Sequence, residues 1–263
     1  WKEGRKEPGK RCQSDNNTKS GAWFSYRTNA GDKIRVKVGI SYMGYNKARE
    51  NAMELKTWNI EDTKSRAVSA WNDILSQVDV ESGDEDRKKI FYSSMYRIFL
   101  QPSDYNGENP VWKTDSPYYG DYHAIWDTFR ATHPFINLIR PTIGGEMVQS
   151  LVDIYENDKY MPDARSSHST GRTQGGSNCD MLVADAFVKG IRNVDYEKAL
   201  DAMIKDATVP PGDDERQYGR GGLPDYNRLG YVSTDYERGC SRTFEYSAND
   251  YAIAVLAKGL GRT

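Results

Sequence analysis

The sequence predicts a mainly α-helical fold that begins where a β-domain ends. Three observations support this prediction. Apolar and polar residues alternate over residues 22–42, the apolar spacing takes a helical period from Lys47 onward, and the later helical stretches are separated by long loops rich in Gly, Arg, Asp and Asn. Helices that alternate with such loops are typical of an array of antiparallel helices, as in an α/α toroid, whereas a four-helix bundle usually has shorter loops.

Residues 22–42 have the pattern of a β-hairpin. Ala22, Phe24 and Tyr26 alternate with polar residues before the turn-forming residues 29–32, and apolar residues then recur at every second position from Ile34 to Ile40. A period of two on both sides of an Asn/Gly/Asp turn predicts two paired strands. We interpret these strands as the end of a β-domain.

The remaining chain is expected to be helical. The segment from Lys47 to about residue 80 contains no Gly or Pro and predicts one long helix or a helix pair with a break near Trp58. A further helix should end before Pro102. Additional helices are expected over residues 122–139, 144–157, 180–191, 194–207 and 241–260. The polar loop between Pro102 and His123 is long for a simple connection, which makes it a candidate functional loop.

Composition disfavours several classes of function. A formal net charge of -2 gives no global field for nucleic acid or an anionic membrane, and no run approaches the 18 apolar residues of a membrane span. The chain has neither an apolar signal core at its start nor a natural beginning, so we expect a fragment of a longer protein. The sequon at residues 16–18 permits N-glycosylation.

The cysteines and histidines do not indicate a metal site. Cys12, Cys179 and Cys240 lie far apart, so one disulfide is possible, but buried free thiols are the simpler interpretation. None of the three histidines has zinc-ligand spacing. Aromatic residues make up 12% of the chain and supply flat faces of the kind that bind sugars, although such residues also fill cores.

The run "WDTFR" is the first candidate site. Asp127 and Arg130 are three residues apart on a predicted helix, so an ordinary ion pair at the helix start explains them. Alternatively, Trp126 stacks on a sugar face and Asp127 accepts hydrogen bonds from sugar hydroxyls, with Arg130 as a brace.

Two other runs also lie where a loop enters a helix. "GRTQGGSNCD" combines glycines, which allow close approach of the backbone to a ligand, with Asn178 as a possible helix cap. "SRTFEYSANDYAIAVLAK" places Glu245 and Asp250 in the first turns of an apolar helix, where acids are also favoured by the helix dipole. The coincidence of three such runs favours a shared cleft.

Taken together, these runs resemble one enzyme family. "AGDKIRVKVGISYMGYNKARENAMEL", "WDTFRATHPFINLI", "GRTQGGSNCDMLVADAFVKGI", "LGYV" and "SRTFEYSANDYAIAVLAKGLG" occur in an order that is similar to glycoside hydrolase family 92, from about Ala22 to the end of the chain. The resemblance implies a calcium-dependent exo-acting α-mannosidase that inverts configuration. It also implies a mannose-containing glycan as substrate and a secreted, periplasmic or cell-surface location.

The resemblance also implies a domain plan. Residues 1–45 would be the C-terminal strands of a β-sandwich, residues 46–83 a linking helical segment, and residues 84–263 the first half of an (α/α)6 toroid. Asp127 matches the family's sugar-binding carboxylate, with Trp126 beside it. Arg172 is a second candidate mannose contact. Glu245 matches a cleft-lining or supporting glutamate rather than the general acid.

The resemblance places other parts of the site outside this chain. The family's general acid, general base and Ca²⁺ ligands are expected downstream of residue 263, so no catalytic or metal-binding residue is assigned in this segment. Two alternatives remain open from the sequence: another α-toroid glycosidase or lyase with a different sugar specificity, and a non-catalytic carbohydrate-binding or structural protein on a truncated toroid.

Overall fold

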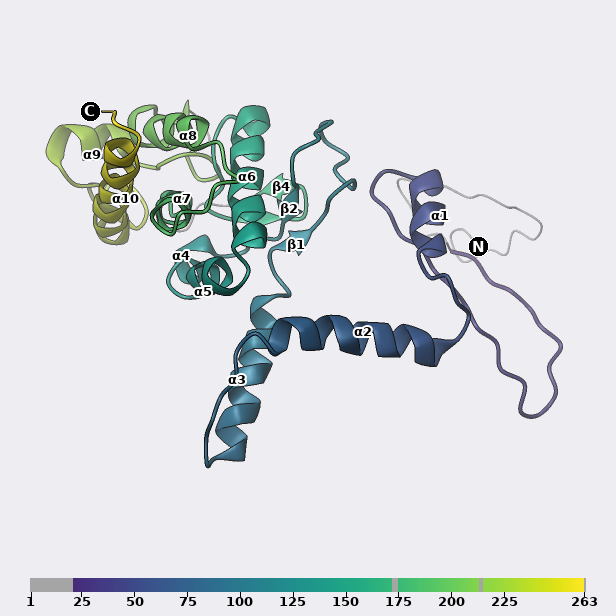
Figure 1. Ribbon diagram of the computed structural model, residues 1–263. Coiled ribbons are helices and arrows are strands. Elements are labelled where there is room, and N and C mark those ends of the chain that lie inside the picture. Colours follow the sequence, from purple (N-terminus) through teal and green to yellow (C-terminus); the bar gives the residue numbers. More distant parts are fainter. Residues whose placement is uncertain (1–20, 172–174, 213–214, 263) are drawn as a thin grey trace. The chain divides into compact units, whose positions relative to one another are not determined.

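The computed structural model describes residues 21–171, 175–212 and 215–262, and it is mainly helical, as predicted (Figure 1). The chain divides into two compact units, residues 1–38 and residues 39–263. The predictions for Cys12, for the sequon at residues 16–18 and for Arg172 concern positions outside the described residues. The predicted domain limits at residues 45 and 83 stay predictions.

The predicted β-hairpin is only partly present. The turn forms: the backbone N–H of Asp32 donates to the carbonyl of Asn29 at 3.2 Å, and the N–H of Asn29 donates to the Asp32 carboxylate at 2.6 Å. The described residues 21–44 nevertheless contain no strand, which corrects the prediction. Phe24 and Val36 are 76% and 69% exposed, so the described part of the chain does not cover this apolar face. A hairpin without a third strand or a covering helix is only marginally stable.

The predicted helix pair and its break are confirmed. Helix α1 spans Tyr45–Met53 and α2 spans Ile60–Leu75, and Trp58 lies in the connection. Asn59 caps α2, because its side chain accepts a hydrogen bond from the N–H of Glu61. Helix α3, Glu85–Ile98, begins in the same way: the Asp84 carboxylate accepts hydrogen bonds from two backbone N–H groups of the first turn.

The helix predicted over residues 122–139 is in fact two helices. Helix α4 spans Ile125–Thr128, and α5 spans Thr132–Ile139. Pro134 explains the interruption, because its nitrogen carries no hydrogen for a helical bond and proline is tolerated only in a helix's first turn. The second helix therefore starts just before Pro134, and the intervening turn carries Arg130.

Four long helices build the core of the larger unit. Helix α6 spans Pro141–Asp158, α7 Cys179–Val188, α8 Tyr196–Thr208 and α10 Gly239–Gly259, close to the predicted ranges. Helix α7 packs on α6, α8 and α10. Their facing sides carry fully buried apolar residues, among them Leu151, Ile154, Leu182, Leu200, Met203 and Leu256. None of the described helices combines the length and apolar character that a membrane-spanning helix needs.

The long loop after α3 is attached to this core. Strand β1, Ser103–Asp104, pairs antiparallel with β2, Tyr119–Gly120, and β3, Arg165–Ser166, pairs with β4, Ser169–Thr170. The indole N–H of Trp112 and the hydroxyl of Thr114 each donate to the carboxylate of Asp153 on α6 at 2.8 Å. The loop is thus fixed to the helical core by buried contacts.

One helix was not predicted. Helix α9 spans Leu223–Leu229 within the stretch expected to be a loop. Gly222 before it and Gly230 after it have φ angles of 71° and 79°, the left-handed region that favours glycine. Glycines that punctuate a loop in the sequence here delimit a short helix, with proline in its first turn.

Candidate functional site

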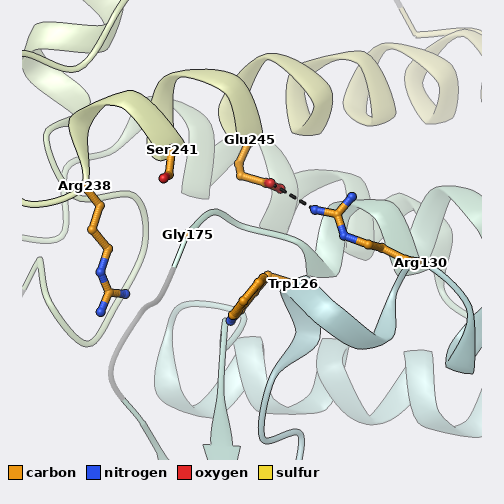
Figure 2. A pocket seen from close by; sticks show the side chains of 6 residues that line it. All are labelled: Trp126, Arg130, Gly175, Arg238, Ser241 and Glu245. Carbon is orange, nitrogen blue, oxygen red and sulfur yellow. Dashed lines mark hydrogen bonds and ion pairs between the residues drawn. The ribbon is translucent and has the colours of Figure 1, made fainter.

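A pocket of about 320 Å³ lies where α4 faces the beginning of α10. Its volume is within the range of small-molecule sites. It is lined by Trp126, Arg130, Gly175, Arg238, Ser241 and Glu245. Trp126 and Arg130 come from "WDTFR", Gly175 from the glycine-rich run, and Ser241 and Glu245 from "SRTFEY", so the three runs share one pocket, as predicted (Figure 2).

Helix α10 and the turn after α4 carry opposite charges into this pocket. The guanidinium of Arg130 donates to the carboxylate of Glu245 at 3.2 Å, and the two residues approach from different elements (Figure 2). The Glu245 side chain is 23% exposed and the Arg130 side chain 56% exposed. Both therefore remain open to a ligand while each holds the other in place.

Of the two interpretations of Arg130, the ion pair with Asp127 is wrong. The charged partner of Arg130 in the structure is Glu245 on α10, not Asp127. Towards Asp127, Arg130 makes a backbone contact, in which its N–H donates to the Asp127 carbonyl at 3.4 Å. The reason is the break after α4: the side chains at positions 127 and 130 do not share the face of one continuous helix.

Residues 175–178 of the glycine-rich run form the glycine-rich wall close to α10. A Cβ on Gly176 would lie 2.7 Å from Oδ1 of Asn249 and 3.0 Å from Cβ of Glu245, so only glycine permits this approach. The N–H of Ser177 donates to Asn249 at 3.1 Å, and the Asn249 amide donates to Asn178 at 3.2 Å. Asn178 occupies the cap position of α7, but its side chain accepts from Asn249 instead of capping.

The structure brings together two of the four predicted substrate-binding residues. Trp126 and Glu245 both line the pocket. Asp127 follows Trp126, and its side chain is exposed outside the six lining residues, so its sugar-binding role stays a prediction. Arg172 belongs to the residues that are not described.

His133, one of the three histidines, is a core packing residue. His133 is buried on α5 with its ring 6.2 Å from the Tyr122 ring, and burial lowers the pKa of His133 to about 4. It is therefore a neutral core residue at physiological pH. Cys179 is a buried free thiol, as expected, whereas Cys240 is an exposed free thiol, which corrects the expectation of a buried one.

Nothing in the sequence indicated the role of Arg220, whose side chain is completely buried. It donates to Ser177, Asp180 and Asp250, so Asp250 is an ion-pair partner and not a pocket acid. Only the run "YGRGGLP" marks this arginine, and its Gly and Pro residues suggested no more than a loop.

Comparisons with known proteins test the family resemblance independently of the structure. The family model described as the glycosyl hydrolase family 92 catalytic domain matches residues 47–263. This chain belongs to glycosyl hydrolase family 92. It is 33% identical over 261 residues to an "Uncharacterized secreted glycosidase" of Arthroderma benhamiae, across 93% of this chain and 30% of that protein.

Two solved family 92 structures from Bacteroides thetaiotaomicron are similar to this family 92 chain. One, an inverting mannosidase, has a TM-score of 0.74 and 32% identity over 82% of this chain and 30% of the other. The second, an α-mannosidase in complex with mannoimidazole, has a TM-score of 0.75 and 27% identity over 84% of this chain and 30% of the other. The chain thus spans 30% of the length of each of these relatives.

Proposed function

We propose that the full-length protein hydrolyses terminal α-linked mannose from glycans or manno-oligosaccharides, and that this segment supplies sugar-binding residues. The observation that carries the proposal is the meeting of Trp126 and Glu245 in one pocket of a family 92 chain. An indole stacks on the apolar face of a sugar ring, and a carboxylate accepts hydrogen bonds from its hydroxyls. The mannosidases of similar structure support mannose as the sugar.

We further propose an inverting mechanism whose acid and base come from elsewhere in the longer chain. Inversion requires a carboxylic acid that protonates the leaving oxygen and a carboxylate that activates water, about 6.5–9.5 Å apart. Glu245 is the single carboxylate among the six residues that line the pocket. It has Arg130 as a partner, which suits a group that holds substrate. We propose that the helices belong to an (α/α)6 toroid preceded by a β-sandwich.

Calcium dependence is part of the proposal, with ligands outside this segment. Over residues 21–171, 175–212 and 215–262, no three His, Cys, Asp or Glu side chains form a group that could hold a metal ion. The described residues therefore do not fit a carboxylate-rich calcium site, and no step of the reaction is assigned to calcium through them. A secreted location is also proposed, because the Arthroderma relative is named as secreted.

The test is hydrolysis by the full-length protein. Purified enzyme is incubated with α-1,2-, α-1,3-, α-1,4- and α-1,6-linked mannobioses, with and without a calcium chelator, and the first-formed anomer is read by proton NMR. We expect release of β-mannose that the chelator abolishes. Chelator-insensitive cleavage of a different glycoside would instead favour another toroid glycosidase, and binding without cleavage of any glycoside would favour a non-catalytic protein.

A further inference from the structure

Arg220 lies on the segment that leads into α9 and contacts both Ser177 and α10. Arg220 as a whole is 1% exposed, and its side chain alone is completely buried. It does not line the pocket itself. A buried arginine is costly unless its charge is paired and its donors are used, so its contacts identify what it holds together.

The guanidinium of Arg220 joins three elements. Its Nε donates to the Ser177 hydroxyl at 2.9 Å, its Nη2 to Asp180 of α7 at 3.2 Å, and its Nη1 to Asp250 of α10 at 2.6 Å. The Ser177 hydroxyl in turn donates to Asp180 at 2.6 Å. One planar group therefore fixes the glycine-rich wall against the start of α7 and the middle of α10.

Two of these elements form the pocket. Ser177 directly follows the two glycines of the wall, and Asp250 lies on α10 after Glu245. The guanidinium also lies over the ring of Tyr246, 5.0 Å from its centroid, and the Tyr246 hydroxyl donates to the carbonyl of Gly221 at 2.9 Å. Arg220 thus contacts α10 at Tyr246, which directly follows Glu245, and at Asp250.

Only arginine can make this set of contacts. The guanidinium presents five N–H donors in a rigid plane, so it can bond a hydroxyl and two carboxylates on different sides at once. The ammonium of lysine is a compact charge on a flexible stem, and it cannot hold three acceptors in the same plane. An arginine-to-lysine change at position 220 therefore keeps the charge but loses the geometry.

We propose that Arg220 is a positioning residue that fixes the glycine-rich wall relative to Glu245 and thereby sets the affinity of the pocket for a sugar ring. The sugar part of this inference rests on the proposed function. The positioning part rests on the contacts alone and can be measured without substrate.

The test uses full-length Arg220→Lys, with Arg262→Lys as the matched control. Arg262 also donates to two carboxylates, Glu197 at 3.4 Å and Asp201 at 2.9 Å, but it lies beyond the end of α10 and does not line the pocket. For Arg220→Lys we expect KM for an α-mannobiose to rise about tenfold with kcat within about threefold, since substrate binding is what weakens. Arg262→Lys should match wild type.

Hydrogen exchange supplies a readout that needs no activity. In Arg220→Lys, backbone exchange should accelerate about tenfold in peptides covering residues 175–178 and 239–246, while peptides of α6 stay unchanged. If Arg220→Lys is poorly folded, the double variant Arg220→Met with Asp180→Asn removes the buried charges together and should show the same local effect.

The outcomes separate the two proposals. Local acceleration in a protein that cleaves no mannoside would support the positioning role and contradict the proposed function. Normal KM together with unchanged exchange in Arg220→Lys would overturn the positioning role. Equal acceleration across α6 and the pocket wall would also overturn it, because Arg220 would then only stabilise the fold as a whole.

Discussion

Nη2 of Arg130 lies 3.2 Å from Oε1 of Glu245, although the two residues are 115 positions apart in the chain. This pair connects the turn after α4 to the first turns of α10 across one side of the pocket (Figure 2). Because both side chains remain partly exposed, the direct contribution of the pair to stability is small. Its consequence is geometric: it sets where the Glu245 carboxylate points.

Glu245→Gln should therefore impair substrate binding more than folding. The amide keeps the shape of the side chain but loses the charge that Arg130 holds. In the full-length enzyme we expect KM for α-mannobiose to rise about tenfold, with the free energy of unfolding changed by less than about 1 kcal/mol. Glu197→Gln, at an exposed ion pair with Arg262, is the control. Complete loss of kcat with unchanged KM would instead make Glu245 a proton-transfer group.

Trp126 should act through its aromatic face. Trp126→Phe keeps a ring and is expected to retain most of the affinity, whereas Trp126→Ala should raise KM for α-mannobiose by about ten- to a hundredfold, as loss of a stacked ring costs a few kcal/mol at most. The measurement is steady-state kinetics together with thermal unfolding. Equal KM values for the two variants would show that stacking on the sugar is not the role of Trp126.

A substitution of Asp127 tests directly the sugar-binding role that the family resemblance implies. In the full-length protein, Asp127→Asn should lower kcat/KM by about a hundredfold or more without lowering Tm, because the side chain is exposed and is not needed for packing. Kinetics and a melting curve on the same preparation suffice. Near-normal turnover would end the assignment of Asp127 as a mannose contact and leave it as an acid at a helix start.

Periodicity was enough to place the long helices and the break near Trp58, but it did not reveal the break between α4 and α5. The apolar spacing over α8 and α10 is set by burial on one side, so the sequence displays it directly. Pro134 was the signal in the sequence for the break between α4 and α5, since proline is tolerated only in the first turn of a helix. Helix α9 was hidden because Gly222 and Gly230 read as loop residues when considered without their backbone angles.

The sequence indicated which three runs form the pocket, but not which side chains contact each other there. Each run enters a helix from a loop, and that shared feature indicated that Trp126 and Glu245 could meet. The partner of Arg130 was not predictable, because sequence spacing offers only the nearby Asp127 while the real partner is 115 positions away. The Arg220 network was missed for the same reason: its carboxylate partners are on α7 and α10.

Asp153 should be important for the stability of the loop after α3. It is 6% exposed and accepts hydrogen bonds from both Trp112 and Thr114. Asp153→Ala leaves these two donors without their acceptor, so we expect a loss of about 2–3 kcal/mol in the free energy of unfolding, measured by urea denaturation. Glu156→Ala, on the same helix at a surface pair with Lys198, is the control and should cost less than about 1 kcal/mol.

Asp206 should make stability depend on pH in the direction opposite to ordinary acid denaturation. Burial, followed by the nearby Asp180 carboxyl, raises the pKa of Asp206 well above its usual value, although Arg220 and Lys205 oppose the shift. Burial likewise raises the pKa of Asp180 to about 7. Both carboxyl groups therefore bind protons more tightly in the folded than in the unfolded chain, so their contribution is greatest below about pH 4 and falls as the pH rises towards 7 and beyond.

Asp206→Asn removes the contribution of Asp206 to this dependence, because a neutral amide occupies the buried position at every pH. As the pH rises from 5 to 8, the variant should lose less stability than wild type, because ionisation of the buried Asp206 carboxyl no longer opposes folding. Urea denaturation at both pH values measures the change. Asp201→Asn, exposed on the same helix, is the control and should follow wild type. A variant that loses stability equally at both pH values would show that Asp206 is ionised and held by donors in the folded protein.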